Sequence, residues 1–379
     1  MDREELAAWL RLTLSEGVGN DSARRLLAAF GLPQAIFSQT LQALEQVVSP
    51  QKAADLTGEP EGLHALVETT WAWLQGVDES GRRRIVTLGD PAYPAPLLAT
   101  DDPPLMLYMM GQELTPDALA RCVAIVGSRN PTPQGEANAQ QFAKAMAGAG
   151  LTVVSGMALG VDGAAHRGAL EGAAPGQLAT IAVVGTGLDR VYPKRHLALA
   201  HAITRQGVIV SEYPLGTPPL APNFPKRNRI ISGLGCGTLV VEAALQSGSL
   251  ITARQAVEQG KEVFAIPGSI HSPQSRGCHL LLKQGAKLVE SAQDVLEELR
   301  LGGSAATDAA PFTSGGEAPG AGRHAPLLGV LGFDPVGLDA LVARTGMDAA
   351  TLQAHLLELE LDGHVARLPG GLFQRAASA

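Results

Sequence analysis

Short apolar runs separated by amphipathic segments dominate the middle of the chain. Seven runs have the length and apolar character of buried strands: 123–126, 151–154, 180–184, 207–210, 237–241, 262–266 and 286–289. Helical spacing lies between most of them, as in Ala139, Phe142, Ala143 and Met146. Repeated strand–helix units with short connections predict a doubly wound, mostly parallel α/β sheet of the Rossmann-like class over residues 121–300.

The N-terminal part has helical spacing only. Apolar residues such as Leu6, Trp9 and Leu10 predict a helical domain over residues 1–75. Gly17-Val18-Gly19 lies between two of its helices. This turn indicates either a SAM-like or helix-hairpin-helix-like domain whose backbone amides hold a DNA phosphate, or a plain helical turn. Residues 76–120 are rich in turn residues and predict a connector.

The C-terminal part regains periodicity after a segment with few bulky apolar groups. Residues 301–324 predict a flexible linker, because Gly, Ala, Ser, Pro and Thr cannot build a core. Two helices and a hairpin over 325–379 predict a winged helix. The candidate recognition helix, 348–362, has four acids and no Lys or Arg. Because phosphate neutralisation dominates DNA affinity, we interpret this domain as a protein-interaction or regulatory module with a protein partner.

Charge is unevenly distributed along the 379 residues. The net charge is −8, yet residues 121–230 hold eleven Lys and Arg against five acids. This basic segment indicates either a local nucleic-acid groove or a solvated basic surface. The N-terminus has no signal-peptide core, and no apolar run approaches the roughly 18 residues of a membrane span. With three scattered cysteines, these features predict a cytoplasmic protein with reduced thiols and no membrane association.

The first strand of the sheet leads into a candidate anion site. Gly127, Ser128 and Arg129 follow an apolar run, and Thr132 and Pro133 have the residue types of a helix N-cap and first turn. A glycine turn before a helix N-terminus binds phosphate through backbone amides. The guanidinium at this turn suits a phosphodiester backbone as well as a cofactor, since it pairs bidentately with phosphate oxygens.

The next turn, at Ser155-Gly156, offers further amides to an anion. Asp162 and His166 follow at i, i+4 spacing on one predicted helix. They are compatible with an acid-oriented histidine for proton transfer, or with a structural pair beside the turn, and we favour the structural pair because no third partner is visible.

More cations follow the third and fourth parallel strands. Lys194 lies between Arg190 and Arg195 in one loop. In the next, residues 223–231, cations alternate with an aromatic and an amide residue: Phe224, Lys226, Arg227, Asn228 and Arg229. We expect Arg129, Lys194, Arg227 and Arg229 to contact phosphates. Phe224 is either a stacking platform for an unpaired base, which favours single-stranded DNA, or a core residue under a loop.

Few residues suggest catalysis. Ser249 and Thr252 lie at the start of another predicted helix. Either residue serves as an N-cap or offers its hydroxyl to a phosphate. The sequence has no nucleophile-elbow, Walker A or HExxH motif. We therefore predict no catalytic residue, cofactor or metal.

Six motifs in order resemble the DNA-processing protein A (DprA/Smf) family of bacteria. They are Ile125 to Arg129, Ser155 to Asp162, Tyr192 to Lys194, Phe224 to Ile231, Ser247 to Ala253 and Ala265 to Gly268. The resemblance covers about residues 88–299. It implies a single-stranded DNA-binding recombination mediator that protects incoming DNA in natural transformation, loads the RecA recombinase and forms a homodimer through the Rossmann-like domain.

The resemblance also implies residue roles. The family's DNA-binding arginine and lysine map to Arg129 and Lys194, and the stretch that lines the same pocket maps to Phe224, Arg227, Asn228 and Arg229. Met157 stands where relatives often have glycine, a small departure.

A second resemblance covers less of the sequence. Gly235, Gly237, Thr238 and Glu242 resemble part of a nucleotide phosphoribohydrolase signature of the lysine-decarboxylase-like group. The glycine pair and the proline that precede these residues in that group are absent here. A nucleotide-hydrolysing enzyme is therefore the alternative to a non-catalytic DNA binder.

Overall fold

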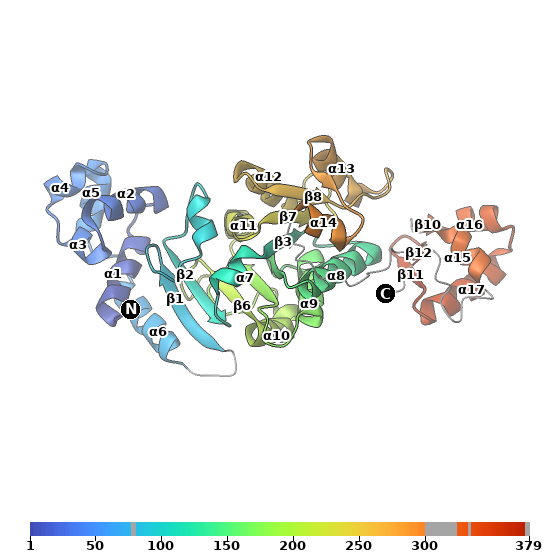
Figure 1. The fold of residues 1–379 in the computed structure, drawn as a ribbon, viewed down its shortest axis with the longest axis horizontal. Coiled ribbons are helices and arrows are strands. Elements are labelled where there is room, and N and C mark those ends of the chain that lie inside the picture. The colour runs from blue at the N-terminus through green and yellow to red at the C-terminus, as the bar shows by residue number, and fades with distance from the viewer. Residues whose placement is uncertain (77–80, 300–323, 333–334, 376–379) are drawn as a thin grey trace.

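The computed structural model describes residues 1–76, 81–299, 324–332 and 335–375. The predicted linker, 301–324, therefore lies outside the described residues except for His324. Figure 1 shows the N-terminal helices at one end, the large sheet in the middle and the C-terminal domain at the other end.

The first 75 residues are helical, as the apolar spacing predicts. Leu6, Trp9 and Leu10 are buried in the core of this domain. The loop after the first helix contains Gly17, whose φ is +71°, and ends at Gly19, the N-cap of the second helix. The elements are α1 (Arg3–Leu14), α2 (Asn20–Phe30), α3 (Pro33–Phe37), α4 (Leu41–Glu45), α5 (Pro50–Thr57) and α6 (Leu63–Gln75).

A mostly parallel sheet forms the centre of the molecule. Within the described residues it has nine strands in the order β1-β2-β6-β5-β4-β3-β7-β8-β9. β1 pairs antiparallel with β2 and β2 pairs antiparallel with β6, while the remaining pairs are parallel. All seven predicted strands are present. The strands are β1 (Arg82–Thr87), β2 (Met106–Gly111), β3 (Cys122–Val126), β4 (Thr152–Ser155), β5 (Thr180–Val184), β6 (Gly207–Ser211), β7 (Gly237–Val240), β8 (Glu262–Ala265) and β9 (Lys287–Leu288).

The predicted connector, 76–120, proves to be part of the sheet. It contains β1 and β2, with η1 (Ala95–Ala99) and α7 (Pro116–Ala120). β2 lies inside the sheet between β1 and β6 and is almost fully buried. Because β1 is an edge strand that starts with three arginines, its apolar content is low, and the flanking prolines and glycines favoured an irregular segment.

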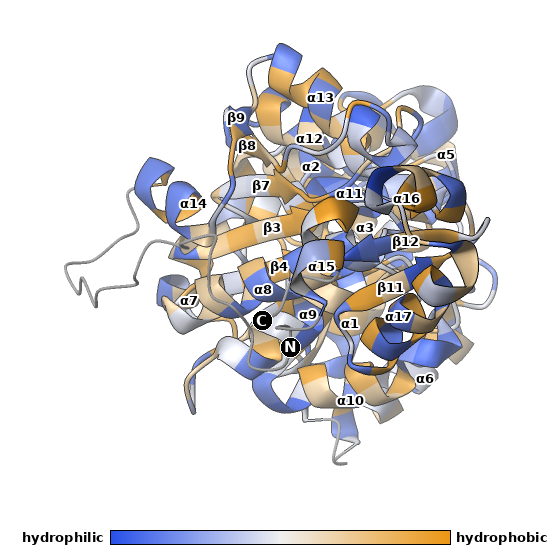
Figure 2. Ribbon diagram, turned by 90° about the vertical axis from the view of Figure 1, so that its right-hand side faces the viewer, coloured by the Kyte–Doolittle hydropathy of each residue, from blue (hydrophilic) through white to orange (hydrophobic). Residues whose placement is uncertain are grey.

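Helices cover both faces of the sheet. The alternate residues of β3 show this division: Val123 and Ile125 pack with Phe142 of α8, whereas Ala124 and Val126 pack with Ile231 of α11. Figure 2 shows hydrophobic colour along the central strands. The elements are α8 (Pro133–Gly148), α9 (Val161–Gly172), η2 (Lys194–His196), α10 (Leu197–Gln206), α11 (Asn223–Leu234), α12 (Ser249–Glu258), η3 (Pro273–Ser275), α13 (Arg276–Lys283) and α14 (Ala292–Glu298).

The C-terminal residues form the predicted winged helix with a hydrophobic core of its own. The predicted recognition helix is α17, which Asp348 caps through hydrogen bonds from the amides of Ala350 and Thr351. No helix in the described parts of the chain is long and apolar enough to cross a membrane. The elements are α15 (Ala325–Leu331), β10 (Val336–Gly337), α16 (Leu338–Thr345), α17 (Ala349–Leu361), β11 (Val365–Leu368) and β12 (Leu372–Arg375).

Candidate nucleic-acid interface

The turn after β3 has the predicted form of an anion site. Thr132 caps α8 by accepting a hydrogen bond from the Gly135 amide at 3.0 Å, and Pro133 occupies the first turn. A Cβ on Gly127 would lie 2.7 Å from Cγ2 of Val161, so only glycine lets α9 approach this closely. The Ser128 carbonyl accepts from the Val161 amide at 3.1 Å, and Arg129 is exposed at the outside of the turn. The fold therefore presents the Arg129 cation from a rigid loop.

The turn after β4 lies beside it and has an unusual backbone. Met157 has a φ of +57°, in the left-handed region that favours glycine, and its side chain is buried. Glycine would adopt this backbone conformation without strain. The Met157 carbonyl accepts a hydrogen bond from Nδ1 of His196 at 3.0 Å. That contact ties η2, and with it Lys194, to the β4 turn.

Arg227 is the most buried cation of the site. Its side chain lies against Gly156, where a Cβ would be 1.7 Å from Nη1. Only 4% of Arg227 is exposed, and its Nε and Nη1 have no hydrogen-bond partner among the described residues. Burial lowers the pKa of Arg227 to about 10, although the negative charge of Asp162 opposes the change. The charge of Arg227 therefore has no hydrogen-bonded carboxylate among the described residues, and it lies close enough to Arg129 for the two cations to repel each other.

Phe224 lies among residues from two other loops. Its ring centroid is 5.6 Å from the Arg129 guanidinium carbon and 5.6 Å from the Tyr192 ring. One ring edge lies over Gly185, at the end of β5. Phe224 is partly exposed and Tyr192 is exposed, so both rings are accessible from solvent. The structure thus brings Arg129, Phe224 and the loop containing Lys194 together at one sheet edge.

Arg229 lies elsewhere, which differs from its expected phosphate contact. Its guanidinium donates to the Glu212 carboxylate through both terminal nitrogens, with Nη1 at 2.9 Å, and Nε donates to the Asp102 carbonyl at 2.8 Å. Burial alone would lower its pKa, but the charges of Glu212 and Asp102 raise it. Residues two apart on a helix face different directions, so Arg227 and Arg229 cannot share one site.

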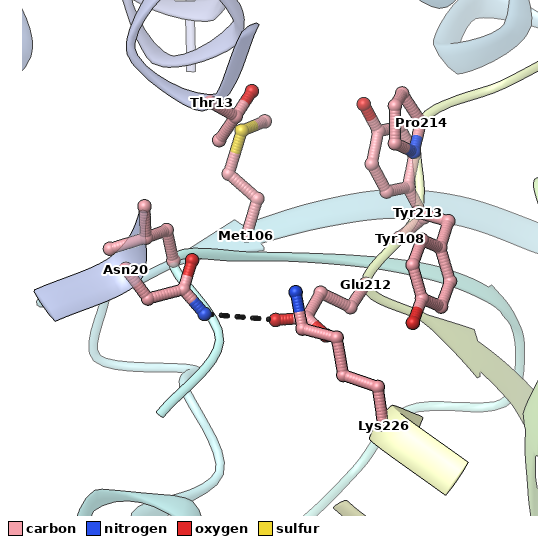
Figure 3. A pocket seen from close by; sticks show the side chains of 9 residues that line it. Thr13, Asn20, Met106, Tyr108, Glu212, Tyr213, Pro214 and Lys226 are labelled. Carbon is pink, nitrogen blue, oxygen red and sulfur yellow. Dashed lines mark hydrogen bonds between the residues drawn. The ribbon is translucent and has the colours of Figure 1, made fainter. Parts of the chain in front are cut away.

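The remaining predicted residues, Lys226, Asn228 and Ser249, differ in their surroundings and in their exposure. Lys226 is exposed and lines a cavity of about 150 Å³ between the helical domain and the sheet (Figure 3). Asn228 is half-buried, and its amide reaches the Gly248 carbonyl at 3.4 Å. Ser249 is buried, with its hydroxyl 2.7 Å from that of Ser247, and Gly248 holds the N-cap position of α12.

The residues that could suggest catalysis have structural partners. Nδ1 of His166 is 2.7 Å from the Thr180 hydroxyl, and burial lowers the pKa of His166 to about 3. Asp162 accepts from the Ala158 amide at 3.2 Å, and burial raises its pKa. These contacts favour the structural interpretation of the Asp162–His166 pair.

Glu242, the acid of the hydrolase-like signature, also has protein partners. It accepts from the Thr132 hydroxyl at 2.6 Å and the Thr132 amide at 2.9 Å, at the start of α8. Burial raises the pKa of Glu242 despite these bonds. Across the described residues, no group of three or more His, Cys, Asp or Glu could hold a metal ion.

Sequence reasoning did not relate these cations to the acids around them. The charge of Asp162, in the first turn of α9, acts on Arg227, while Glu212 and Asp102, in two loops, hold Arg229. The acids are far from the arginines in sequence, so no local signal linked them. The helical spacing of Arg227 and Arg229 did carry a signal, because it separates their directions.

Comparisons with known proteins agree with this architecture. Residues 84–300 match the family model described as DNA recombination-mediator protein A, and residues 311–371 match the DprA winged helix domain. Protein Smf of Escherichia coli K12 is 42% identical over 308 residues, covering 80% of each chain. DNA processing protein DprA of Bacillus subtilis is 40% identical over 263 residues, covering 69% of this chain and 86% of that protein.

Two solved structures share the fold. The X-ray structure of DprA from Streptococcus pneumoniae has a TM-score of 0.63 and 34% identity, covering 79% of this chain and 98% of that one. DNA processing protein A from Helicobacter pylori, whose structure concerns its single-stranded DNA binding mode, has a TM-score of 0.52 and 29% identity, covering 59% and 99%. The family models, the relatives and the shared fold show that this chain belongs to the DprA/Smf family of DNA recombination-mediator proteins.

Proposed function

We propose that this protein binds single-stranded DNA at the edge of the sheet formed by the turns after β3, β4 and β5 and by the start of α11. The observation that carries the proposal is the group of Arg129, Phe224 and Tyr192 at this edge, where the Phe224 ring centroid is 5.6 Å from the Arg129 guanidinium carbon and 5.6 Å from the Tyr192 ring. Arg227, buried against Gly156, adds a second positive charge close to Arg129.

The neighbouring groups fit a flexible strand. Arg129, whose guanidinium carbon is 5.6 Å from the partly exposed Phe224 ring, and Lys194, two residues after the exposed Tyr192, are exposed cations. Cations neutralise the backbone, and aromatic rings stack on unpaired bases without reading sequence. Duplex DNA hides its base faces, so this combination favours a single strand. Amides of Gly127, Ser128 and Gly156 would complete the phosphate contacts.

The wider role follows from family membership. We propose that the protein is a non-catalytic mediator that protects incoming single strands in natural transformation, loads the RecA recombinase and works as a homodimer through the Rossmann-like domain. The helix-capping contacts of Glu242 support a binding role over nucleotide hydrolysis. A RecA strand-exchange assay with and without the protein, beside light scattering for the dimer, tests this part.

Binding itself is tested with fluorescence anisotropy of a labelled oligo-dT strand. Arg129→Ala plus Lys194→Ala should weaken binding about tenfold or more, since charge-assisted phosphate contacts are lost. The plot of log affinity against log salt should become shallower by about 1.4, or about 0.7 for each lost contact.

The matched control removes the same charge elsewhere. Arg82→Ala plus Lys144→Ala changes two largely exposed cations, on β1 and α8, and should leave affinity within about twofold at physiological salt. Equal losses in both double variants would mean a general charge effect. Unchanged binding by the Arg129 and Lys194 variant would overturn the site.

A further inference from the structure

A group of charged and polar side chains joins the helical domain to α11, the helix that carries Phe224 and Arg227. We call it the interdomain network and define it as Asn20, Arg24, Asp102, Glu212 and Arg229. Figure 3 shows Asn20 pointing to Glu212 across the floor of the interdomain cavity, close to Lys226. The network therefore lies between the two domains and next to the proposed DNA site.

The helical domain contributes the first two members. Nδ2 of Asn20, at the start of α2, donates to Asp102 and Glu212 at 3.2 Å each. One turn on, Nη1 of Arg24 is 2.9 Å from the Asp102 carboxylate, and Nη2 donates to the Asp101 carbonyl at 3.2 Å. A helix of the N-terminal domain is thus bound directly to two acids of the sheet domain.

The other side of the network fixes α11. Nε of Arg229 is 3.2 Å from the Asp102 carboxylate, besides its contacts with the Asp102 carbonyl and with Glu212. The side chains of Arg229 and Glu212 are each only 10% exposed. Burial alone would raise the pKa of Asp102, but hydrogen bonds from Arg24 and Asn20 and the charge of Arg229 lower it. Both domains therefore stabilise the same carboxylate.

The position of α11 sets the position of the DNA-facing groups. Arg229 lies on one side of this helix, while Arg227 lies on another and packs against Gly156, a contact with no room even for a Cβ. A rotation of α11 about its axis would move both Arg227 and Phe224. Because a helix is rigid on this scale, its anchoring at Arg229 is transmitted to the DNA side.

We propose that Asn20 and Arg24 of the helical domain are positioning residues for single-stranded DNA binding, acting through Asp102 and Arg229 on the orientation of α11. The inference rests on the proposed function, because it assigns the helical domain a part in the affinity of that same site. It gives the helical domain a task that needs no contact between this domain and DNA.

The direction in which substitution of an acid changes DNA affinity separates a positioning role from a purely electrostatic effect. Removing a negative charge near a polyanion site raises affinity if charge alone acts. If Asp102 positions Arg229, Asp102→Asn should instead lower affinity for oligo-dT, by about threefold or more. The matched control is Asp101→Asn, which removes the same charge from an exposed neighbour that contributes only its carbonyl to the network.

The two network residues of the helical domain, Asn20 and Arg24, have a matched control on the same helix. Arg24→Ala and Asn20→Ala should each lower affinity, and Arg24→Lys should restore part of it. Arg25→Ala should bind like the original chain, because Arg25 is more than half exposed and pairs only with Asp21 of its own helix at 3.1 Å among the contacts described. Thermal melting of each variant confirms that the fold is retained.

The outcomes are distinguishable from failure of the proposed site. If the original chain does not bind oligo-dT, or binding ignores Arg129 and Lys194, the proposed function fails. If binding depends on those two cations but Asp102→Asn binds as tightly as the original chain or tighter, the positioning role is overturned. Loss in Asp102→Asn and Arg24→Ala, with Asp101→Asn and Arg25→Ala unaffected, supports it.

Discussion

The basic edge of the sheet and the winged-helix domain differ in how well the charge of their surfaces suits DNA. A winged helix is a common DNA-binding fold, yet its helix α17 here carries acids and no cation. The sheet is a general scaffold, yet one edge of it gathers Arg129, Lys194 and Arg227. The proposed site therefore rests on the charge and exposure of side chains and not on the fold of the domain.

The two regions also differ in how their charges are held. In the sheet domain, Arg227 is buried without a hydrogen-bond acceptor among the described residues. At the start of α17, Asp348 uses its carboxylate to cap that helix. The charge of Arg227 therefore has no hydrogen-bonded partner in the described fold, whereas the charge of Asp348 has its partners in the helix that it caps.

The largest expected effect comes from displacing Arg227. Gly156→Ala would place a Cβ 1.7 Å from Nη1, so the guanidinium must leave its position. Affinity for oligo-dT should fall about tenfold or more, as expected when charge-assisted hydrogen bonds are lost. Anisotropy titration measures it.

The control for that variant lies at another glycine of the same domain. A Cβ on Gly248, next to α12, would meet nothing within 4 Å. Gly248→Ala should therefore bind within about twofold of the original chain. If Gly156→Ala also binds normally in a folded protein, Arg227 does not contact the strand.

A smaller effect should follow from making the winged helix resemble the basic edge. Glu360→Lys plus Asp362→Lys reverses two acids at the end of α17, and affinity for duplex DNA should rise a few-fold at low salt only, through nonspecific phosphate attraction. Gel-shift titrations at two salt concentrations measure it. If the unaltered chain already binds duplex DNA tightly, and the substitutions leave that affinity unchanged, this domain already binds DNA.

The smallest effect on binding is expected at Glu242. Glu242→Gln should lower stability by about 1 kcal/mol, because the carboxylate supports the Thr132 cap of α8. Oligo-dT affinity should stay within about twofold. Chromatography should show no free base released from a nucleoside monophosphate by either protein. Base release that this substitution abolishes would instead establish the hydrolase alternative.

The sequence was sufficient for most of the sheet and for the winged helix. Runs such as 123–126 are buried on both faces of a parallel sheet, so they are continuously apolar and easily found. The strands β1 and β2 were both missed. In β1, Arg82 to Arg84 conceal an edge strand. The apolar strand β2 is almost fully buried, but it directly follows turn residues such as Pro103 and Pro104, which favoured an irregular segment. Complete burial is therefore not enough for a strand to be found when the residues around it are typical of turns.

The candidate site was predicted in part. Arg129, with its glycine turn, followed from a strand–turn–helix pattern that depends only on adjacent residues. The separation of Arg227 from Arg229 depends on α11 being a helix from Asn223, and on acids at 102 and 212 that are distant in sequence. Such pairings arise from tertiary packing, which the local sequence does not encode.

The unpaired donors of Arg227 have a consequence for the protein without ligand. A chain that buries two unsatisfied N–H groups gives up part of its own folding free energy. A strand that binds the folded chain at the proposed site would offset this loss, because a ligand of the folded state stabilises it by mass action. A rise in melting temperature on addition of oligo-dT would therefore measure occupancy of that site.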